Sequence, residues 1–333
     1  MSLIDIIVGV KNEEKYIRRC IRSLQDQTIK DIHILVVDGV SSDKTPQIVS
    51  EIAENDSRVR LLENPLEVIS SGRNIGLNAS GAEYVAYLDG HCYVDEDWLE
   101  TLYNTFKTYS HGCKLAAVGS TYSSPQDDSF FGKTIAHSLQ TFFGGFGTAY
   151  TSSEKIIPVE TVAFALYRRS TLLNEHVAYD ETMTQCEDTD FNYQLIKAGY
   201  LLLKHPRALV HQYRRSNPQQ FSRQMVNYGE GRARFTRKYP ETLHWYHLIP
   251  LIVFFYPILF LIVLFLLVTG FIGLNIFLLV SAPILIYIVI DLIYAFSISI
   301  KINNWKGVCS MIIFPIVHFG YGIGFLKGFL IKR

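Results

Sequence analysis

From about residue 247 to its end, this chain of 333 residues is almost continuously apolar, and this feature constrains its fold more than any other. The apolar residues form three segments, at about 248–269, 271–296 and 307–326. Each approaches the ~20 residues that a helix needs to cross the hydrocarbon core of a bilayer. Buried core helices are the alternative, but apolar runs of this length rarely occur in soluble cores. The sequence therefore predicts about three transmembrane helices within residues 247–333.

The charges that flank these segments predict their orientation. Seven basic residues precede the first segment, and Lys301 and Lys306 lie between the second and the third. Because cytoplasmic loops carry an excess of Lys and Arg, we expect the preceding domain and the 297–306 loop in the cytoplasm. If all three segments cross, the basic residues at the C-terminal end face outward, against the same tendency. The sequence leaves two other arrangements open. One segment is re-entrant, or residues 248–296 form a tight hairpin.

Residues 1–240 have the composition of an ordinary soluble domain. The formal net charge of the chain is zero, so nothing in the charge balance indicates nucleic-acid binding. The five cysteines are scattered without the spacing of a metal site, and an odd number argues against a disulfide framework. A reducing cytosolic setting is the simplest interpretation. A strand-like segment begins within a few residues of Met1, so we expect no signal peptide.

Short β-branched runs alternate with segments of helical spacing up to Asp89. The expected strands are 4–10, 33–38, 59–62 and a run that ends at Asp89, and the expected helices are 13–27, a stretch after Asp43, and 72–79. This alternation predicts an α/β domain with a mostly parallel sheet and right-handed crossovers. Ligands in such sheets bind beyond the carboxyl ends of the strands. Asn12, Asp38 and Asp89 all lie at or just past those ends.

Asp89 and His91 stand two positions apart at the end of an apolar run, Tyr84-Val85-Ala86-Tyr87-Leu88. Side chains two residues apart along a strand point the same way, so both can bind one divalent cation. Mg²⁺ prefers oxygen ligands, whereas Mn²⁺ accepts imidazole more readily. The pair therefore predicts a site for Mn²⁺ or Mg²⁺, with the expectation shifted toward Mn²⁺.

Five segments in order carry a resemblance to a known family. They are Val10-Lys11-Asn12-Glu13-Glu14, Val37-Asp38-Gly39-Val40-Ser41-Ser42-Asp43, Gly72-Arg73-Asn74-Ile75-Gly76, Tyr87-Leu88-Asp89-Gly90-His91 and Cys186-Glu187-Asp188-Thr189-Asp190. Together they resemble the family-2 glycosyltransferases, inverting enzymes with a GT-A nucleotide-sugar-binding fold, over roughly residues 4–215. Within the family, the Asp-x-His form and the three C-terminal apolar segments look most like the membrane-anchored glucosyltransferase of succinoglycan synthesis.

The resemblance implies a set of nucleotide contacts at the strand ends. The backbone of Val10 would approach the base, Glu13 would bind the ribose beside Asn12, and Asp38 would accept from the N3–H of uracil. As an alternative, Asn12 and Glu13 cap the following helix, where Asn is favourable. Ser41, Ser42 and Asp43 are expected to form the turn and cap of the next helix. The usual family pattern has a second Asp where this chain has Gly39.

Arginines and a later histidine complete the predicted donor site. Arg73 and Arg215 are expected to contact phosphates, Arg73 in fork geometry and Arg215 on the diphosphate of the donor or of a lipid acceptor. For Arg73, a solvated position on a helix surface is the alternative. His211 is a candidate third metal ligand, because GT-A folds often recruit a later His; a structural role is its alternative.

Asp188 is the predicted general base. The pair Glu187-Asp188 matches the family's Glu-Asp pair at the start of a helix, and by resemblance the Asp removes the proton of the acceptor hydroxyl. Helix capping is the alternative for these acids and for Asp190, since carboxylates are favoured at helix N-termini. Gln212-Tyr213-Arg214-Arg215-Ser216 partly matches the Gln-x-x-Arg-Trp motif of processive members, but Ser216 stands where Trp would bind a growing chain.

These observations predict three regions: a GT-A domain at 1–215, an amphipathic interfacial helix region at 216–246 and a transmembrane region at 247–333. We expect a multi-pass enzyme of the cytoplasmic membrane with its catalytic domain in the cytoplasm. It would transfer a hexose from a UDP-sugar to a polyprenyl-diphosphate-linked saccharide in polysaccharide or glycan assembly. The loop 120–160, rich in Phe up to Phe146, is expected to shape the acceptor site or to touch the membrane.

Two rival functions stay open. The first is a polyprenyl-monophosphate sugar synthase, in which a lipid phosphate attacks the sugar directly. Such an acceptor is already ionised and needs no general base, so the pair at Glu187 and Asp188 favours a hydroxyl acceptor. The second is a membrane protein whose nucleotide fold only binds or scaffolds.

Overall fold

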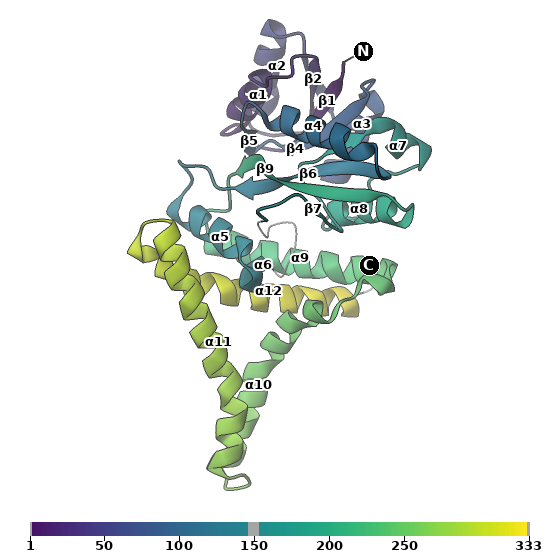
Figure 1. Cartoon of the computed structure of the whole chain (residues 1–333). Coiled ribbons are helices and arrows are strands. Elements are labelled where there is room, and N and C mark those ends of the chain that lie inside the picture. The colour runs from purple at the N-terminus through teal and green to yellow at the C-terminus, as the bar shows by residue number, and fades with distance from the viewer. Residues whose placement is uncertain (1, 146–152, 332–333) are drawn as a thin grey trace. The chain divides into compact units, whose positions relative to one another are not determined.

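The computed structural model describes residues 2–145 and 153–331. The chain forms two compact units, residues 1–126 with 148–213 and residues 127–147 with 214–333. The first unit contains a sheet covered by helices, and the second is helical (Figure 1). The segment 127–147 therefore belongs to the helical unit, although the sequence placed it in the predicted GT-A domain. The predicted three-region division itself stays a prediction.

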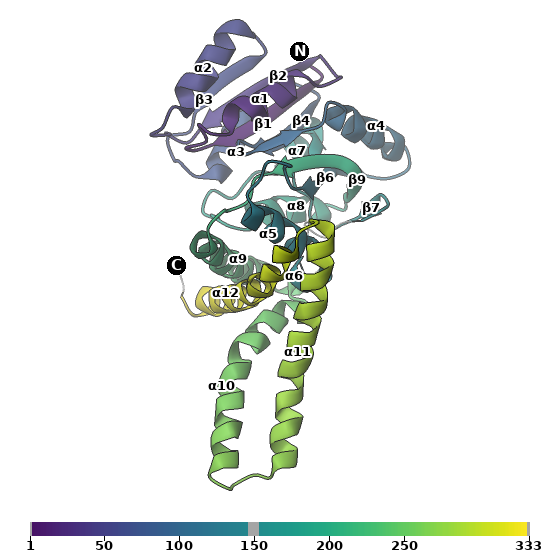
Figure 2. The same cartoon turned by 90° about the vertical axis from the view of Figure 1, so that its left-hand side faces the viewer.

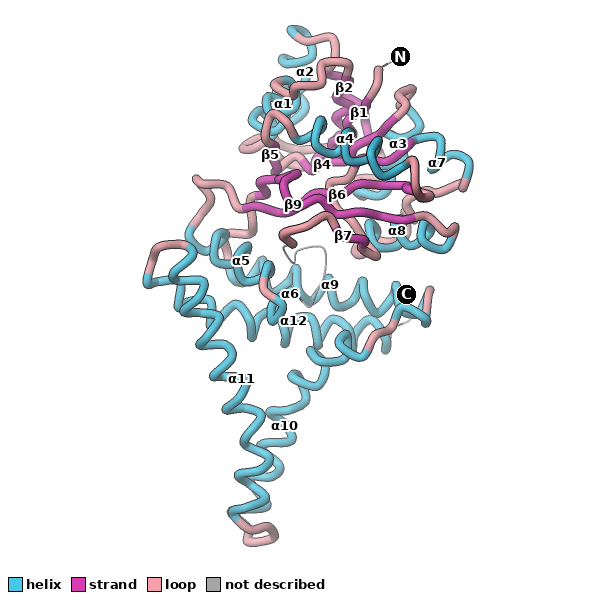
Figure 3. The backbone as a smooth tube through the Cα atoms, in the orientation of Figure 1, coloured by secondary structure: helices cyan, strands magenta, loops and turns pink. Residues whose placement is uncertain are grey.

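One sheet organises the first unit, and its strands are magenta in Figure 3. Within the described residues the strands are β1 (Ile4–Val10), β2 (Ile32–Asp38), β3 (Val59–Glu63), β4 (Tyr84–Asp89), β5 (Cys92–Val94), β6 (Leu115–Ser123), β7 (Ile157–Pro158), β8 (Leu166–Arg168) and β9 (Leu201–Gln212). Their order is β3-β2-β1-β4-β8-β6-β9-β5, and β7 pairs with β9.

The first four strands in this order are parallel, as the alternating pattern predicted. The sheet becomes mixed at β8, which pairs antiparallel with both β4 and β6. The α/β GT-A-like architecture with a mostly parallel sheet is therefore confirmed. The inner parallel strands β1, β2 and β4 are mostly apolar on both faces, as expected where helices cover both sides.

Helices of the first unit connect these strands. They are α1 (Ile17–Gln25), α2 (Thr45–Asn55), α3 (Ile69–Ala79), α4 (Trp98–Ser110), α7 (Arg169–Asn174) and α8 (Glu187–Lys197). Leu24 of α1 and Leu99 of α4 pack with Ile6 on one face of the sheet, whereas Leu77 of α3 and Phe191 of α8 pack on the other. The two faces thus form two apolar cores.

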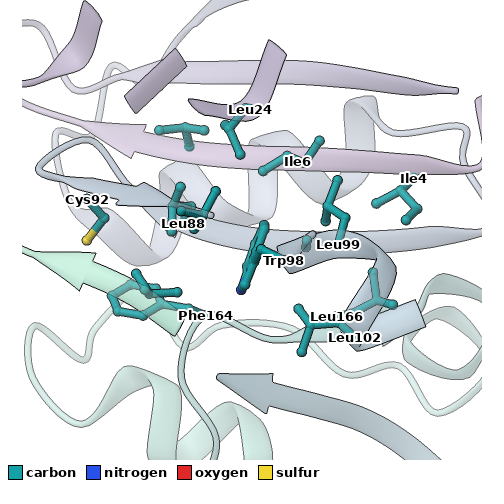
Figure 4. Close-up of a cluster of buried hydrophobic side chains, with 14 of the residues drawn as sticks. Ile4, Ile6, Leu24, Leu88, Cys92, Trp98, Leu99, Leu102, Phe164 and Leu166 are labelled. Carbon is teal, nitrogen blue, oxygen red and sulfur yellow. The ribbon is translucent and has the colours of Figure 1, made fainter. Parts of the chain in front are cut away.

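Figure 4 shows the core beneath α1 and α4, in which Trp98 lies beside Leu88 and Leu99. The indole of Trp98 is buried, and its Nε1 donates to Oγ of Ser120 at 2.8 Å. A buried indole N–H needs such a partner, because leaving it unpaired costs free energy. This core holds β4 rigidly up to Asp89, the last residue of the strand.

The second unit consists of helices, and Figure 2 shows two of them projecting as a hairpin. Its helices are α5 (Phe130–Gln140), α6 (Phe142–Gly145), α9 (Pro218–Lys238), α10 (Ile249–Val268), α11 (Leu274–Lys301) and α12 (Ser310–Leu330), with short 3₁₀ turns at Pro240–Thr242, Trp245–Leu248 and Trp305–Cys309. Three stretches are long and apolar enough to cross a membrane: Trp245–Val268, Leu274–Lys301 and Trp305–Leu330. The prediction of three such C-terminal helices is confirmed.

The loop predicted at 120–160 contains regular structure. Helices α5 and α6 occupy much of it, and β7 lies near its end. Phe143 of α6 contacts Phe314 and His318 of α12 within the helical unit. Phe146 lies outside the described residues.

Candidate active site

The carboxyl ends of β1, β2 and β4 meet at one edge of the sheet. In the register of the parallel strands, Val10 pairs with Asp38 and Gly9 pairs with Asp89. The strand ends that carry the predicted nucleotide and metal residues are therefore neighbours. This is the edge at which ligands bind in open α/β sheets.

The loops after β1 and β2 are bonded to each other. The backbone N–H of Asn12 donates to Oγ of Ser41 at 2.8 Å, and the N–H of Ser42 donates to Oδ1 of Asn12 at 2.8 Å. Asn12 and Val40 both have positive φ, 56° and 55°, which is unusual for a β-branched residue such as Val40. Hydrogen bonds therefore join the loops after the two strands, and each loop contains one residue with a strained backbone. Such backbone strain is common at binding sites.

The helix that follows β1 begins later than predicted, at Ile17 instead of near Glu13. The carbonyl of Glu13 accepts from the N–H groups of Tyr16 and Ile17, and no side-chain cap precedes α1. Asn12 therefore does not cap this helix, because its side chain accepts from the loop after β2. The capping alternative for Asn12 is wrong.

The carboxylate of Asp38 is buried and bonded within its own turn. Its Oδ1 accepts from Oγ of Ser41 at 2.6 Å, and its Oδ2 accepts from the N–H of the same residue at 2.9 Å. Asp43 in turn accepts from the N–H and Oγ1 of Thr45, the first residue of α2. The predicted turn at Ser41, Ser42 and Asp43 is present, but the N-cap residue of α2 is Lys44, which has no side-chain cap. The contact of Asp38 with a base stays a prediction.

A tight turn between β4 and β5 presents a candidate metal group. Ligand atoms of Asp89, His91 and Cys92 all lie within 4.8 Å of one another. Gly90 makes this turn possible, because a Cβ there would lie 2.6 Å from Cγ1 of Val10. A carboxylate, an imidazole and a thiol fit a divalent cation, and the set is softer than two carboxylates. Cys92, which follows the turn, was not among the predicted ligands, because the cysteines lack the spacing of a metal site in the sequence.

Glu13 and Gln212 hold the imidazole of His91. Nδ1 of His91 lies 2.9 Å from Oε1 of Glu13 and donates to it, because a carboxylate can only accept. Its Nε2 lies 3.4 Å from Nε2 of Gln212 on β9. A carboxylate on one ring nitrogen is the usual support for a metal-binding histidine, whose other nitrogen binds the metal.

His211 directly precedes Gln212 on β9, but its side chain contacts other residues. Its Nε2 pairs with Oδ1 of Asp95 at 3.0 Å, and its ring stacks on Tyr93 with centroids 4.6 Å apart. Among the described residues, the structure does not bring it into the group of Asp89, His91 and Cys92. Its role as a third ligand stays a prediction.

Arg73 joins the turn between β4 and β5 to the start of α8. Its Nη2 lies 3.3 Å from Oδ1 of Asp89, and its Nη1 contacts Oε1 of Glu187 at 3.2 Å and Oδ1 of Asp188. The side chain is only 6% exposed, so the alternative of a solvated surface arginine is wrong. One buried guanidinium therefore connects three carboxylates from β4 and α8. Its predicted contact with phosphate stays a prediction.

Asp188 lies in a crowded environment beside this arginine. Burial, together with the charges of Glu187 and Asp89, raises the pKa of Asp188 to about 7 against the opposing attraction of Arg73. The hydroxyl of Tyr179 donates to Oδ1 of Asp188 at 3.5 Å. A carboxyl group with a pKa near neutrality is suited to general base catalysis.

The backbone before Asp188 is strained. Cys186, immediately before α8, has a φ of 59°, the left-handed conformation that non-glycine residues rarely adopt.

Asp190 is buried in the first turn of α8, and its Oδ2 accepts from Gln194. Asp190 therefore acts within the helix, in agreement with the helix N-terminal alternative for this residue.

Tyr179 and Gln212 are further candidates for the site. The Arg73 guanidinium lies 5.1 Å from the ring centroid of Tyr179, which stacks on Phe191. The sequence around Tyr179 or Gln212 does not indicate this role, because Tyr179 contacts Arg73 and Gln212 contacts His91, both far away in the sequence. Gln212 begins the partial Gln-x-x-Arg motif, but its contact here is with His91.

Arg215 is exposed and belongs to the helical unit, so its contact with a diphosphate stays a prediction.

The chain is similar to curated proteins, and to one of them along almost its whole length. A dolichyl N-acetyl-alpha-D-glucosaminyl phosphate 3-beta-D-2,3-diacetamido-2,3-dideoxy-beta-D-glucuronosyltransferase of Methanococcus voltae is 25% identical over 339 residues, which cover 99% of this chain and 98% of that protein. The succinoglycan biosynthesis protein ExoA of Rhizobium meliloti is 25% identical over 232 residues, 69% of this chain and 68% of that protein. The narrower resemblance to the succinoglycan enzyme is thus distant.

A solved structure and a family model were also matched. The crystal structure of S. aureus TarS in complex with UDP-GlcNAc is 19% identical, with a TM-score of 0.49, and the match covers 69% of this chain and 66% of that one. The model described as Glycosyl transferase family 2 matches residues 5–173. This match covers nearly all of β1 to β8 and α7, and therefore the strand ends that hold Asp38 and Asp89 and the helix α3 that holds Arg73. The chain belongs to glycosyl transferase family 2.

Proposed function

We propose that this protein transfers a sugar from a UDP-sugar to a hydroxyl of a lipid-linked saccharide, with inversion at the anomeric carbon. The observation that carries the proposal is the contact of buried Arg73 with both Asp89 and Asp188. It sets the predicted base next to the strand end where the family binds its donor. A fold that only binds or scaffolds has no need of such a pair.

Asp188 supplies the base. The acceptor hydroxyl attacks the anomeric carbon from the face opposite the diphosphate and gives its proton to a carboxylate oxygen of Asp188. A new glycosidic C–O bond forms as the C–O bond to the diphosphate breaks, and UDP leaves. A pKa raised to about 7 makes this carboxylate a stronger base than an ordinary Asp while most of it is still ionised above pH 7.

Asp89 and His91 would hold a divalent cation, Mn²⁺ or Mg²⁺, beside the donor. When bound, such an ion neutralises the charge that develops on the departing diphosphate. Glu13 orients the imidazole of His91, and Arg73 neutralises part of the negative charge of Asp89. The imidazole in this set supports Mn²⁺ as the better cofactor.

The acceptor is proposed to be a saccharide on a polyprenyl phosphate or diphosphate. Three helices long and apolar enough to cross a membrane support a lipid-linked substrate, because a soluble acceptor needs no such anchor. The similar Methanococcus voltae protein is named for a dolichyl phosphate-linked N-acetylglucosamine as acceptor. The donor sugar is proposed to be a hexose or a hexose derivative, and the process to be polysaccharide or glycan assembly.

Asp188→Asn tests this proposal directly. In full-length protein in membranes, supplied with Mn²⁺, a panel of UDP-sugars and lipid-linked saccharides, the variant should lose transfer at least 100-fold while UDP still raises the thermal midpoint. Asp31→Asn, an exposed carboxylate just before the first residue of β2, is the matched control and should keep full activity. Absence of transfer by the unaltered protein to every lipid-linked saccharide would refute the proposal.

The polyprenyl-monophosphate sugar synthase is the second candidate. It is favoured only if a lipid phosphate accepts sugar and this transfer survives Asp188→Asn. The contacts of Glu187 and Asp188 with Arg73 favour the hydroxyl acceptor, because they build a base that a lipid phosphate does not require.

A further inference from the structure

The three helices that could cross a membrane are not alike in the helical unit. In α10 and α11, 6% of the most apolar stretch is buried inside the protein, whereas in α12 half of it is buried. Phe265 of α10 and Leu279 of α11 are 63% and 74% exposed, as expected of side chains that face lipid. By contrast, Phe314 and His318 of α12 are almost fully buried. α12 therefore has a protein partner along its length.

Phe314 and His318 lie against α6 and α11. Another face of α12 packs on α9, and there the two helices touch through their backbones. A Cβ on Gly324 of α12 would lie 1.9 Å from the carbonyl oxygen of Val226, and one on Gly229 of α9 would lie 2.1 Å from the carbonyl oxygen of Tyr321. Gly320 and Gly328 continue this contact at four-residue spacing. Figure 1 shows α9 and α12 side by side. Only glycine permits so close an approach of two helices.

An ion pair fixes the same contact at its far end. Nζ of Lys327 lies 2.8 Å from Oε2 of Glu230 on α9, and Oε1 of that glutamate accepts from Arg234 at 2.5 Å. α9 also carries Arg223, Arg237 and other basic residues. A helix with this charge cannot enter the hydrocarbon core without a large penalty. Because α12 is bound to it along its length, α12 must lie at the same depth as α9.

α10 and α11 form a separate hairpin. The loop 269–273 joins them, and the hydroxyl of Tyr256 donates to the carbonyl of Val280 at 2.8 Å. In Figure 2 the two helices run side by side away from α9 and α12. Their lengths, about 30 Å and about 42 Å from the rise per residue, match the thickness of a bilayer. The tip of the hairpin is uncharged, with Phe271 78% exposed.

α12 crosses this hairpin at the first turn of α10 and near the middle of α11. Gly322 of α12 faces Pro250 in the first turn of α10, where a Cβ would lie 2.5 Å from the carbonyl oxygen. On the α11 side, Nδ1 of His318 lies 2.7 Å from the hydroxyl of Tyr287, and its Nε2 donates to the carbonyl of Phe143 on α6. The contact with Pro250 lies at the end of α10 away from the 269–273 loop, the end that the interfacial region of a membrane would surround, and Tyr287 lies half-way along α11.

We infer that only α10 and α11 enter the bilayer, as a hairpin whose two ends are both cytoplasmic, while α12 lies with α9 along the cytoplasmic surface of the membrane. The partner of the hairpin is the lipid bilayer. This arrangement places Lys327 on the same side as the arginines of α9 and as Lys301 and Lys306. All of these basic residues then obey the positive-inside tendency, whereas three crossings would place Lys327 on the outer side. The inference does not depend on the reaction proposed above.

Cysteine labelling and reporter fusions in intact bacterial cells that express the full chain test the topology. In a background with Cys309→Ser, the Phe329→Cys variant should react with a membrane-impermeant maleimide only after the cells are opened, as exposed Cys113 should in the same molecules. A fluorescent protein fused after Arg333 should fluoresce, and alkaline phosphatase fused there should be inactive. Labelling of position 329 in intact cells, or active alkaline phosphatase, would overturn the inference.

Gly324→Ala tests the contact between α9 and α12, and Gly273→Ala is its matched control. An added methyl at Gly324 must displace the backbone of Val226, whereas nothing lies within 4 Å of one at Gly273. The first variant should lower the thermal midpoint of the purified full-length protein by about 4 °C, and the second should leave it unchanged. A helix that crosses the bilayer apart from α9 would tolerate both changes equally, so equal midpoints would contradict the arrangement.

Discussion

Nδ1 of His91 lies 2.9 Å from Oε1 of Glu13, although 78 residues separate the two in the chain. The contact joins the turn after β4 to the loop after β1. Because the carboxylate accepts from Nδ1, the lone pair of the neutral imidazole is on Nε2. In the proposed metal site, Glu13 would thus orient His91 for cation binding, a role different from the ribose contact that the family resemblance implied.

Glu13→Gln should weaken cation binding. The amide still accepts a hydrogen bond from Nδ1, but it lacks the charge that makes the imidazole a better ligand. Loss of such a supporting group typically costs 10–100-fold in metal affinity. We expect this loss in the Mn²⁺ concentration that gives half-maximal UDP binding, measured by thermal shift. Glu54→Gln on the exposed face of α2 is the control, and equal Mn²⁺ requirements in both variants would refute the role of Glu13.

His91→Asp should change the choice of metal. The variant restores two carboxylates at the turn, an oxygen set that Mg²⁺ prefers, so the ratio of transfer rates with Mn²⁺ and Mg²⁺ should fall. Removal of metal with a chelator should abolish transfer by both proteins, and Mn²⁺ should restore it. A rate ratio that the substitution leaves unchanged would mean that His91 does not bind the ion.

Arg73→Met should both inactivate and destabilise the protein. The substitution leaves Asp89, Glu187 and Asp188 without their shared cation, and loss of one partner of a buried pair typically costs about 3–5 kcal/mol in the free energy of unfolding. Arg18→Met is the matched control, because its pair with Glu51 is about 60% exposed on both sides and such pairs contribute at most ~1 kcal/mol. Denaturant unfolding of both variants measures the difference, and similar losses would contradict the role of Arg73.

The pH dependence of transfer should report Asp188. The base acts as a carboxylate, so the rate should fall as the pH drops through about 7, where Asp188 becomes protonated. The negative charge of Glu187 helps to raise the pKa of Asp188. Glu187→Gln removes that charge and should move the acid limb of the profile to lower pH. The rate is measured at saturating substrate from pH 5 to pH 9, and a shift to higher pH would exclude Asp188 as the titrating group.

Local sequence patterns determined the elements and the edge at which the site lies. The apolar runs that end at Val10, Asp38 and Asp89 are strands at the predicted places, because their pattern is that of buried parallel strands. The rule that such strands end at one edge then brought the three ends together. The length and composition of α10 and α11 likewise required no tertiary information.

Tertiary structure decided which side chains act together. An arginine on a helix resembles any surface arginine in sequence, and only the tertiary arrangement of α3, the end of β4 and the start of α8 buries Arg73 among three carboxylates. The contact of Glu13 with His91 depends on the register of β1 and β4. In the C-terminal part, hydropathy made three apolar segments equivalent. The close approach of Gly324 to Val226 separates α12 from the other two, because hydropathy counts apolar side chains and does not show which of them face protein.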